Sequence, residues 1–85
     1  MTKTARLYDF ATTLLNDRHF TRVYLRLPAS ASVFANSRAR QIRTSKHTAD
    51  AFGLDCLGNV TVLWADGRCQ QLITDAEIKA SGLFR

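Results

Sequence analysis

The feature that most restricts how this chain can fold is an Asp-Gly pair between two runs of β-favouring residues. Residues 59–65 read Asn-Val-Thr-Val-Leu-Trp-Ala, residues 68–73 read Arg-Cys-Gln-Gln-Leu-Ile, and Asp66-Gly67 joins them. A two-residue hairpin turn needs a positive φ at both central positions, which Asp and Gly tolerate. The sequence therefore predicts an antiparallel hairpin over residues 59–73.

A two-residue turn also sets the pairing of the two strands. The predicted cross-strand pairs are Trp64 with Cys69, Val62 with Gln71, and Val60 with Ile73. These side chains share one largely apolar face, which we expect to lie in the core. The opposite face is half apolar, and we expect it to be partly covered.

The two ends of the chain predict helices. In residues 4–16 apolar side chains recur at the spacing of one helical face, and Thr4 is a candidate N-cap. Residues 74–82 begin with Thr74-Asp-Ala-Glu77, the pattern of a capping box, and end at Gly82. We expect the first helix to pack on the sheet and Leu83-Phe84 to fold back onto the domain.

A further strand is predicted over residues 20–27, ending at Pro28, which lacks a backbone donor. Side chains alternate between the two faces of a strand. The expected core face carries Thr21, Val23, Leu25 and Leu27. The expected open face carries Phe20, Arg22, Tyr24 and Arg26, a mixture of aromatic rings and guanidinium groups.

Residues 29–55 allow two interpretations. As strand and loop over 36–55, they complete a curled antiparallel sheet, and Val60–Arg68 is similar to the strand-turn-strand of small SH3-like or Sm-like barrels. As helices near 31–42 and 45–53, they give the element order of a winged-helix domain. The strand signals favour the first interpretation.

The predicted fold class is therefore α+β, in a single domain over residues 1–85. An N-terminal helix packs on a small antiparallel sheet that includes the Asp-Gly hairpin (59–73), and a short C-terminal helix follows. The winged-helix arrangement remains the alternative.

Composition indicates a cytoplasmic protein. No apolar run approaches the ~18 residues that a membrane-spanning helix needs, so no membrane partner is expected. The first nine residues lack the apolar core of a signal peptide. In the cytoplasm Cys56 and Cys69 stay reduced, and we expect one or both thiols to be buried.

Positive charge is concentrated in one internal stretch. No acidic residue lies between Asp17 and Asp50, whereas the rest of the chain has seven acidic residues against five basic ones. The basic residues of the stretch are Arg18, Arg22, Arg26, Arg38, Arg40, Arg43 and Lys46. The net charge of +5 therefore arises there, and such a local field attracts polyanions.

The function predicted from this pattern is nucleic-acid binding, by a small accessory or regulatory protein. Arginines that alternate with an aromatic ring suit phosphates and stacked bases, and the partner is DNA or RNA. The candidate binding residues are Arg22, Tyr24, Arg26, Arg38, Arg40, Arg43 and Lys46.

Two alternatives remain from other functional classes. In one, the basic face docks on an acidic site of a partner protein, as an inhibitor or adaptor of the phage or plasmid type that acts on a nucleic-acid enzyme. In the other, His19 or His47 serves as the base of a metal-independent ribonuclease. A regulator of this size is also compatible with a homodimer.

No cofactor, metal site or catalytic residue is predicted, and the chain is not expected to be an enzyme. His19, His47, Cys56 and Cys69 are too widely spaced in sequence for the usual zinc-ligand pairs.

Overall fold

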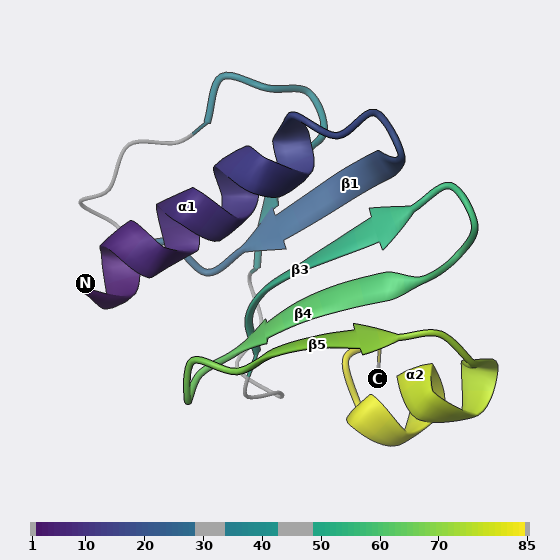
Figure 1. Cartoon of the computed structure of the whole chain (residues 1–85). Coiled ribbons are helices and arrows are strands. Elements are labelled where there is room, and N and C mark those ends of the chain that lie inside the picture. Colours follow the sequence, from purple (N-terminus) through teal and green to yellow (C-terminus); the bar gives the residue numbers. More distant parts are fainter. Residues whose placement is uncertain (1, 29–33, 43–48, 85) are drawn as a thin grey trace.

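The computed structural model describes residues 2–28, 34–42 and 49–84 (Figure 1). Two helices and five strands follow one another along the chain. They are helix α1 (Lys3–Leu15), strands β1 (Phe20–Leu25), β2 (Ala39–Gln41), β3 (Ala49–Asp55), β4 (Val60–Trp64) and β5 (Cys69–Leu72), and helix α2 (Asp75–Ser81).

The strands form a single sheet in the order β2-β1-β3-β4-β5. β1 and β2 are parallel, and the other three pairs are antiparallel. The α+β class, the N-terminal helix on a sheet and the short C-terminal helix are confirmed, but the sheet is mixed and not purely antiparallel. Residues 26–38, between β1 and β2, provide the crossover of about a dozen residues that a parallel pair requires.

The winged-helix alternative is wrong. β3 occupies residues 49–55 and pairs with both β1 and β4, where that alternative required a helix over 45–53. β2 lies within the other expected helix, 31–42. The described strands also form an open sheet, with β2 and β5 at its edges, and not a closed barrel. Residues 29–33 and 43–48 of the predicted segments lie outside the described residues.

Helix α1 covers one face of the sheet. Its buried side chains Leu7, Phe10, Ala11, Leu14 and Leu15 pack against Val23, Leu25, Ala51 and Leu63. The helix begins at Thr2, whose hydroxyl accepts a hydrogen bond from the Ala5 N–H (3.1 Å), so the N-cap is Thr2 and not Thr4. At Gly53 a Cβ atom would lie 2.6 Å from Leu14 Cδ1, so a glycine allows the helix to approach β3 closely.

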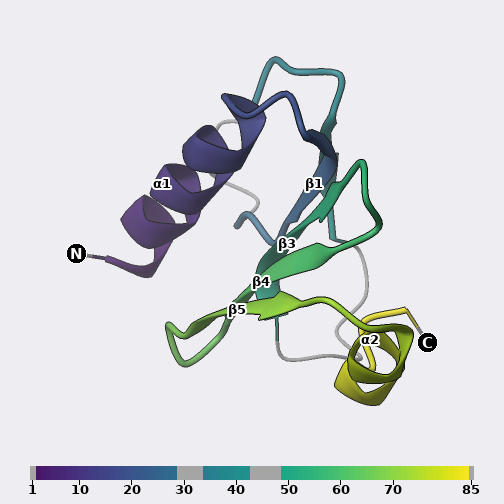
Figure 2. The ribbon, with the colours of Figure 1, turned by 45° about the vertical axis from the view of Figure 1, so that its right-hand side comes forward.

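A second apolar cluster lies on the other face of the sheet. It is formed by Ile42, Ala49, Phe52, Val60, Val62, Leu72 and Leu83. Ile78 of α2 packs against this cluster, so α1 and α2 lie on opposite sides of the sheet (Figure 2). The predicted capping box at Thr74 and Glu77 is present, and Gly82 ends α2 with a φ of 75°.

The hairpin 59–73 forms as predicted, but its register differs by one residue. The observed pairs are Val60 with Leu72, Thr61 with Gln71, Val62 with Gln70, and Leu63 with Cys69. Only glycines have a positive φ among the described residues, so Asp66 does not take the conformation that a two-residue Asp-Gly turn requires.

The turn is instead a three-residue loop that ends at Gly67, whose φ is 92°. The Gly67 N–H donates to the Trp64 carbonyl (2.9 Å), and the Trp64 N–H donates to the Arg68 carbonyl (2.8 Å). The shift leaves Ile73 62% exposed, although it was expected in the core. Leu72 takes its place beside Val60 and is buried at 3%, while Leu63 is buried on the opposite face, against α1.

Neither helix in the described part of the chain has the length and apolar character needed to cross a bilayer.

Candidate binding surface on strands β1 and β2

Three residues of the predicted binding set lie together on β1 and β2, on the face opposite α1. Tyr24 of β1 is in register with Arg40 of β2 on one side and with Phe52 of β3 on the other. Neighbouring side chains in register project from the same face of a sheet. Arg22 lies two residues before Tyr24 and shares this face. We call Arg22, Tyr24 and Arg40 the β1–β2 surface.

Both arginines of the β1–β2 surface are exposed, and Tyr24 is half-buried. In the part of the chain that the structure describes, no ion pair involves Arg22 or Arg40. Arg40 Nη1 donates to the carbonyls of Ser37 and Ala39 (3.0 Å to Ala39), and these bonds hold the guanidinium near the backbone at the start of β2. A guanidinium has five N–H donors, so donors remain for a bound anion.

The expected alternation along β1 holds for Arg22 and Tyr24 but fails for Phe20. The register between β1 and β3 shifts between Phe20 and Arg22, which marks a bulge. A bulge places one extra residue in a strand and re-aims the side chains before it. Phe20 therefore packs against the apolar cluster between α1 and the sheet. It lies so close to Gly53 that a Cβ atom added there would be 3.0 Å from Phe20 Cδ1.

An aromatic cluster of Tyr24, Phe52 and Phe84 extends the β1–β2 surface across the sheet. The rings of Tyr24 and Phe52 are stacked, with centroids 4.8 Å apart and planes at 19°. Phe84, which follows α2, meets Phe52 edge to face at 5.4 Å and 86°. Phe84 is 52% exposed, whereas Phe52 is buried. Phe84 thus presents an aromatic ring to solvent next to Phe52, on the sheet face that also carries Tyr24 and the two arginines.

Arg38 has a different environment from Arg22 and Arg40. Its half-buried guanidinium donates to the backbone carbonyls of Leu15, Asp17 (3.2 Å) and Phe20 (2.8 Å). The last carbonyls of a helix have no partner within the helix, and basic side chains commonly satisfy them. Arg38 therefore joins the end of α1 and the start of β1 to the start of β2.

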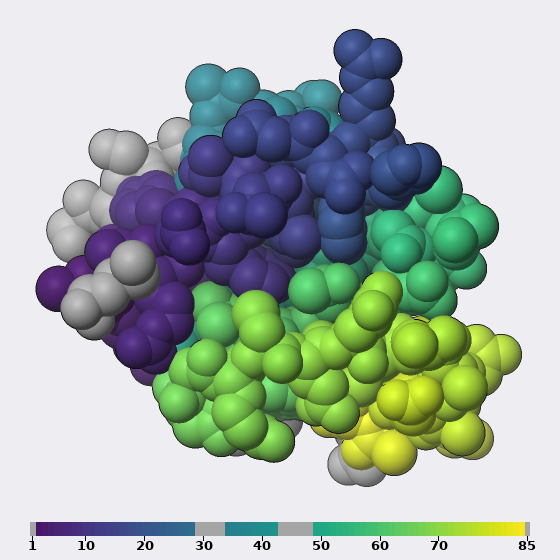
Figure 3. Space-filling model, in the orientation of Figure 1, coloured from purple at the N-terminus to yellow at the C-terminus, as the bar shows by residue number. Residues whose placement is uncertain are grey.

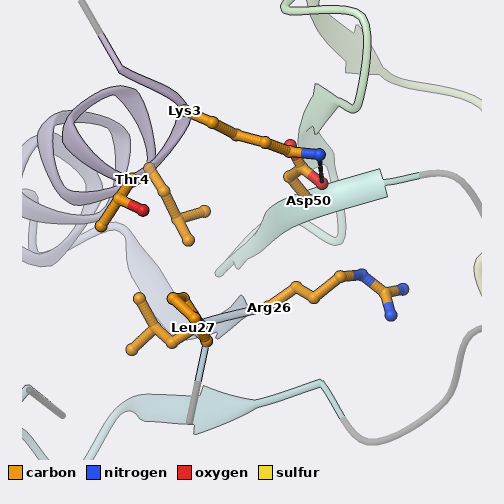
Figure 4. Close-up of a pocket in the computed structure, with 7 residues that line it drawn as sticks. Lys3, Thr4, Arg26, Leu27 and Asp50 are labelled. Carbon is orange, nitrogen blue, oxygen red and sulfur yellow. Dashed lines mark ion pairs between the residues drawn. The ribbon is translucent and has the colours of Figure 1, made fainter. Parts of the chain in front are cut away.

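Arg26 lies at the end of β1, next to a cavity of about 260 Å³ (Figure 4). Its backbone N–H donates to the Asp50 carbonyl (2.8 Å), and its Nε donates to the Ala49 carbonyl (3.3 Å). Asp50 is only 7% exposed, and its carboxylate pairs with Lys3 Nζ at 3.6 Å. The Arg26 side chain extends away from this ion pair, as Figure 4 shows.

Three acidic residues lie across the sheet from β1 and β2, in the β4–β5 hairpin and in α2. Asp66 lies in the β4–β5 turn, and Asp75 and Glu77 lie in the first turn of α2. In Figure 3 the hairpin and α2 occupy the lower half of the molecule, below α1 and the start of β1. Asp17 and Asp55, by contrast, lie next to the start of β1, so the two signs of charge are only partly separated in space.

Asp66 is held in its ionised form by its own turn. Its Oδ1 accepts a hydrogen bond from the Arg68 N–H (3.0 Å), and its Oδ2 lies 2.7 Å from Arg68 Nε. The backbone hydrogen bond first, and then the guanidinium, lower the pKa of Asp66 below its usual 3.8. Asp66 and Arg68 therefore neutralise each other at the hairpin tip.

The sequence did not reveal a contact between His19 and Cys56. The Cys56 Sγ lies 3.7 Å from His19 Nδ1, and the Cys56 N–H donates to the His19 carbonyl (2.7 Å). The antiparallel pairing of β1 and β3 brings together two residues that are far apart in sequence. Both Cys56 and Cys69 are exposed free thiols, which corrects the expectation of burial.

The remaining residues of the predicted set, Arg43 and Lys46, lie outside the described residues, as does His47. Within the described ranges, no group of three or more His, Cys, Asp or Glu side chains is arranged to hold a metal ion.

Comparison with protein-family models, with curated proteins and with solved structures finds no match to this chain.

Proposed function

We propose that this protein binds nucleic acid through the β1–β2 surface, as an accessory or regulatory protein. The observation that carries the proposal is the register that places Arg40 beside Tyr24, with Arg22 on the same face. Guanidinium groups form paired hydrogen bonds with phosphate oxygens, and an aromatic ring between them contacts a base or sugar.

Charge segregation supports the same proposal. The acidic residue nearest in sequence after the basic stretch, Asp50, is buried and paired with Lys3. Asp66, Asp75 and Glu77 lie at the hairpin tip and in α2, across the sheet. Asp17 and Asp55 lie closer, just before β1 and at the end of β3, and each accepts hydrogen bonds from backbone N–H groups. The basic side chains of Arg22, Arg26, Arg38 and Arg40 outnumber these two carboxylates, so the field around β1 and β2 stays positive and attracts a polyanion over several ångströms.

The test is a fluorescence-polarisation titration with labelled nucleic acid at several salt concentrations. Each phosphate that a protein neutralises adds about −0.7 to −0.9 to the slope of log K against log salt. The double variant Arg22→Gln/Arg40→Gln is expected to lose about 1.5 from the magnitude of that slope and at least tenfold in affinity.

The chain offers a control of equal charge. Arg68→Gln/Lys79→Gln removes two exposed basic side chains from the acidic end of the sheet. We expect this control to bind with nearly the wild-type slope. Equal losses in the two double variants would mean that only net charge matters, which would contradict a localised surface.

A second candidate is a protein-binding inhibitor or adaptor. The half-exposed Phe84, on the same sheet face as the arginines, favours it, because aromatic and Arg side chains are the groups enriched at protein interfaces. A complex captured from a lysate that survives nuclease digestion would support this candidate, and loss of every partner after digestion would support nucleic acid.

The other sequence-based expectations stay predictions. In the ribonuclease alternative His19 is the described candidate base, and incubation with RNA tests it directly. The exposed free thiols of Cys56 and Cys69 fit the reducing cytoplasm, where we propose that the protein acts. Light scattering after gel filtration tests the homodimer.

A further inference from the structure

We infer that the nucleic acid is single-stranded, and that its bases stack on Phe84 while its phosphates bind Arg22 and Arg40. This inference rests on the proposed function and names the ligand class for the same surface. It also adds a residue, Phe84, that was not among the predicted binding residues.

The described helices offer no means of reading a duplex beside the β1–β2 surface. Proteins that read duplex DNA commonly insert a helix into the major groove. Helix α1 lies on the opposite face of the sheet, and its apolar side packs against the strands. Helix α2 carries Asp75 and Glu77 in its first turn, which repel phosphates.

The sheet face suits a single strand better. Single-stranded ligands expose the π-faces of their bases, and proteins bind them with aromatic side chains next to a positively charged groove. Tyr24 has one face against Phe52, which limits it to a single free ring face. Phe84 stands edge-on to Phe52, and about half of its surface is free for a base.

The arginines and Phe84 lie on one continuous path. Arg40 neighbours Tyr24 in register, Tyr24 stacks on Phe52, and Phe52 contacts Phe84. Arg22 is in register with Leu54, on the same face and one pair further along β1 and β3. A strand that crosses β1 and β3 therefore meets guanidinium groups first and an exposed ring next.

The test compares four ligands of about 20 nucleotides, a length that exceeds the usual site size of one small domain. They are a pyrimidine single strand of DNA, the same strand as RNA, the corresponding DNA duplex, and an abasic single strand that keeps the phosphates. We expect the wild-type protein to bind one of the pyrimidine single strands at least tenfold more tightly than the duplex or the abasic strand.

Variants at Phe84 distinguish a loss of base stacking from a loss of folding. Phe84→Leu keeps an apolar side chain against Phe52 but removes the ring. It should weaken binding of the pyrimidine strand between about fivefold and 150-fold, the range measured for stacked aromatic residues. Binding of the abasic strand should not change, because only phosphates contribute there. Phe84→Trp should restore tight binding.

Leu57→Ala is the matched control, since Leu57 is 81% exposed in the turn between β3 and β4. It should bind every ligand as the wild type does. If Phe84→Leu affected the abasic strand as much as the pyrimidine strand, the ring would not be stacking on bases, and the inference would fail.

Different results would contradict the single-strand inference and the proposed binding of nucleic acid. Equal or tighter binding to the duplex would overturn the single-strand inference and leave the proposed function standing. Absence of binding to all four ligands at low salt would overturn both, and would leave the protein-partner candidate.

Discussion

Arg38 should stabilise the fold without contributing to binding, although it belongs to the same basic stretch as Arg22 and Arg40. We consider Arg38→Met, which keeps the aliphatic stem and removes the guanidinium. The carbonyls of Leu15, Asp17 and Phe20 then lose the guanidinium as a donor, and of these the Asp17 carbonyl still accepts from the Phe20 N–H (3.2 Å). A hydrogen bond that involves a charged group contributes about 1.5–3 kcal/mol.

The three bonds are not additive, because they share one half-buried side chain and water can reach part of the site. We therefore expect a loss of about 2–4 kcal/mol in the free energy of unfolding, a large fraction of the 5–15 kcal/mol typical of a domain. Urea titration followed by circular dichroism and by the fluorescence of the single tryptophan measures this loss.

Arg18→Met is the control, since Arg18 is exposed in the loop between α1 and β1 that the Arg38 guanidinium contacts. Its effect should stay within about 0.5 kcal/mol. A stability of Arg38→Met equal to that of Arg18→Met would refute the structural role. So would a folded Arg38→Met protein with a reduced salt slope of nucleic-acid binding, because that result would place Arg38 in the binding surface.

Further predictions concern the hairpin and its neighbours. Leu72→Ala should cost about 2–5 kcal/mol, while Ile73→Ala should cost less than about 0.5 kcal/mol; urea titrations showing the reverse order would restore the register expected from a two-residue turn. Thr74→Ala should cost about 1 kcal/mol by removing the capping box of α2, measured in the same way; no change would mean that the box adds nothing to folding. Asp66 has a lowered pKa in the folded state, so its contribution to stability is present above its unfolded pKa, near 3.8, and is lost as the pH falls through the lower folded pKa. In an NMR titration Arg68→Gln should raise the pKa of Asp66, and an unchanged value would show that the guanidinium plays no part.

The hairpin shows which level of structure the sequence can predict. Two β-favouring runs around Asp-Gly predicted the hairpin correctly. The register depended on the sign of φ at Asp66, which tolerates either value, and the turn that formed has three residues. One residue of loop length reversed the faces of the second strand and placed Leu72 in the core instead of Ile73.

Strand β3 was ambiguous for a different reason. It is the central strand and is buried on both faces, so the polar–apolar alternation that marks a half-exposed strand is missing. Ala49 and Phe52 also fit the inward face of a short helix that Gly53 would end. The apposition of α1 against β3 determines the choice, and a local pattern does not contain that information.

The candidate site was predictable where local geometry sufficed. Alternation along β1 placed Arg22 and Tyr24 on one face correctly, but the bulge that turned Phe20 toward α1 has no clear sequence signal. The contact of Arg38 with the end of α1 and that of Cys56 with His19 arise only from tertiary pairing. Charge clustering alone does not distinguish an arginine that binds a partner from one that holds the fold together.

The most direct test of the central claim is the salt dependence of binding to a labelled pyrimidine single strand, for the wild type and for the two charge-matched double variants. The account predicts a slope whose magnitude falls by about 1.5 in Arg22→Gln/Arg40→Gln and hardly at all in Arg68→Gln/Lys79→Gln. The same slope in all three proteins, or no binding by the wild type at low salt, would contradict it.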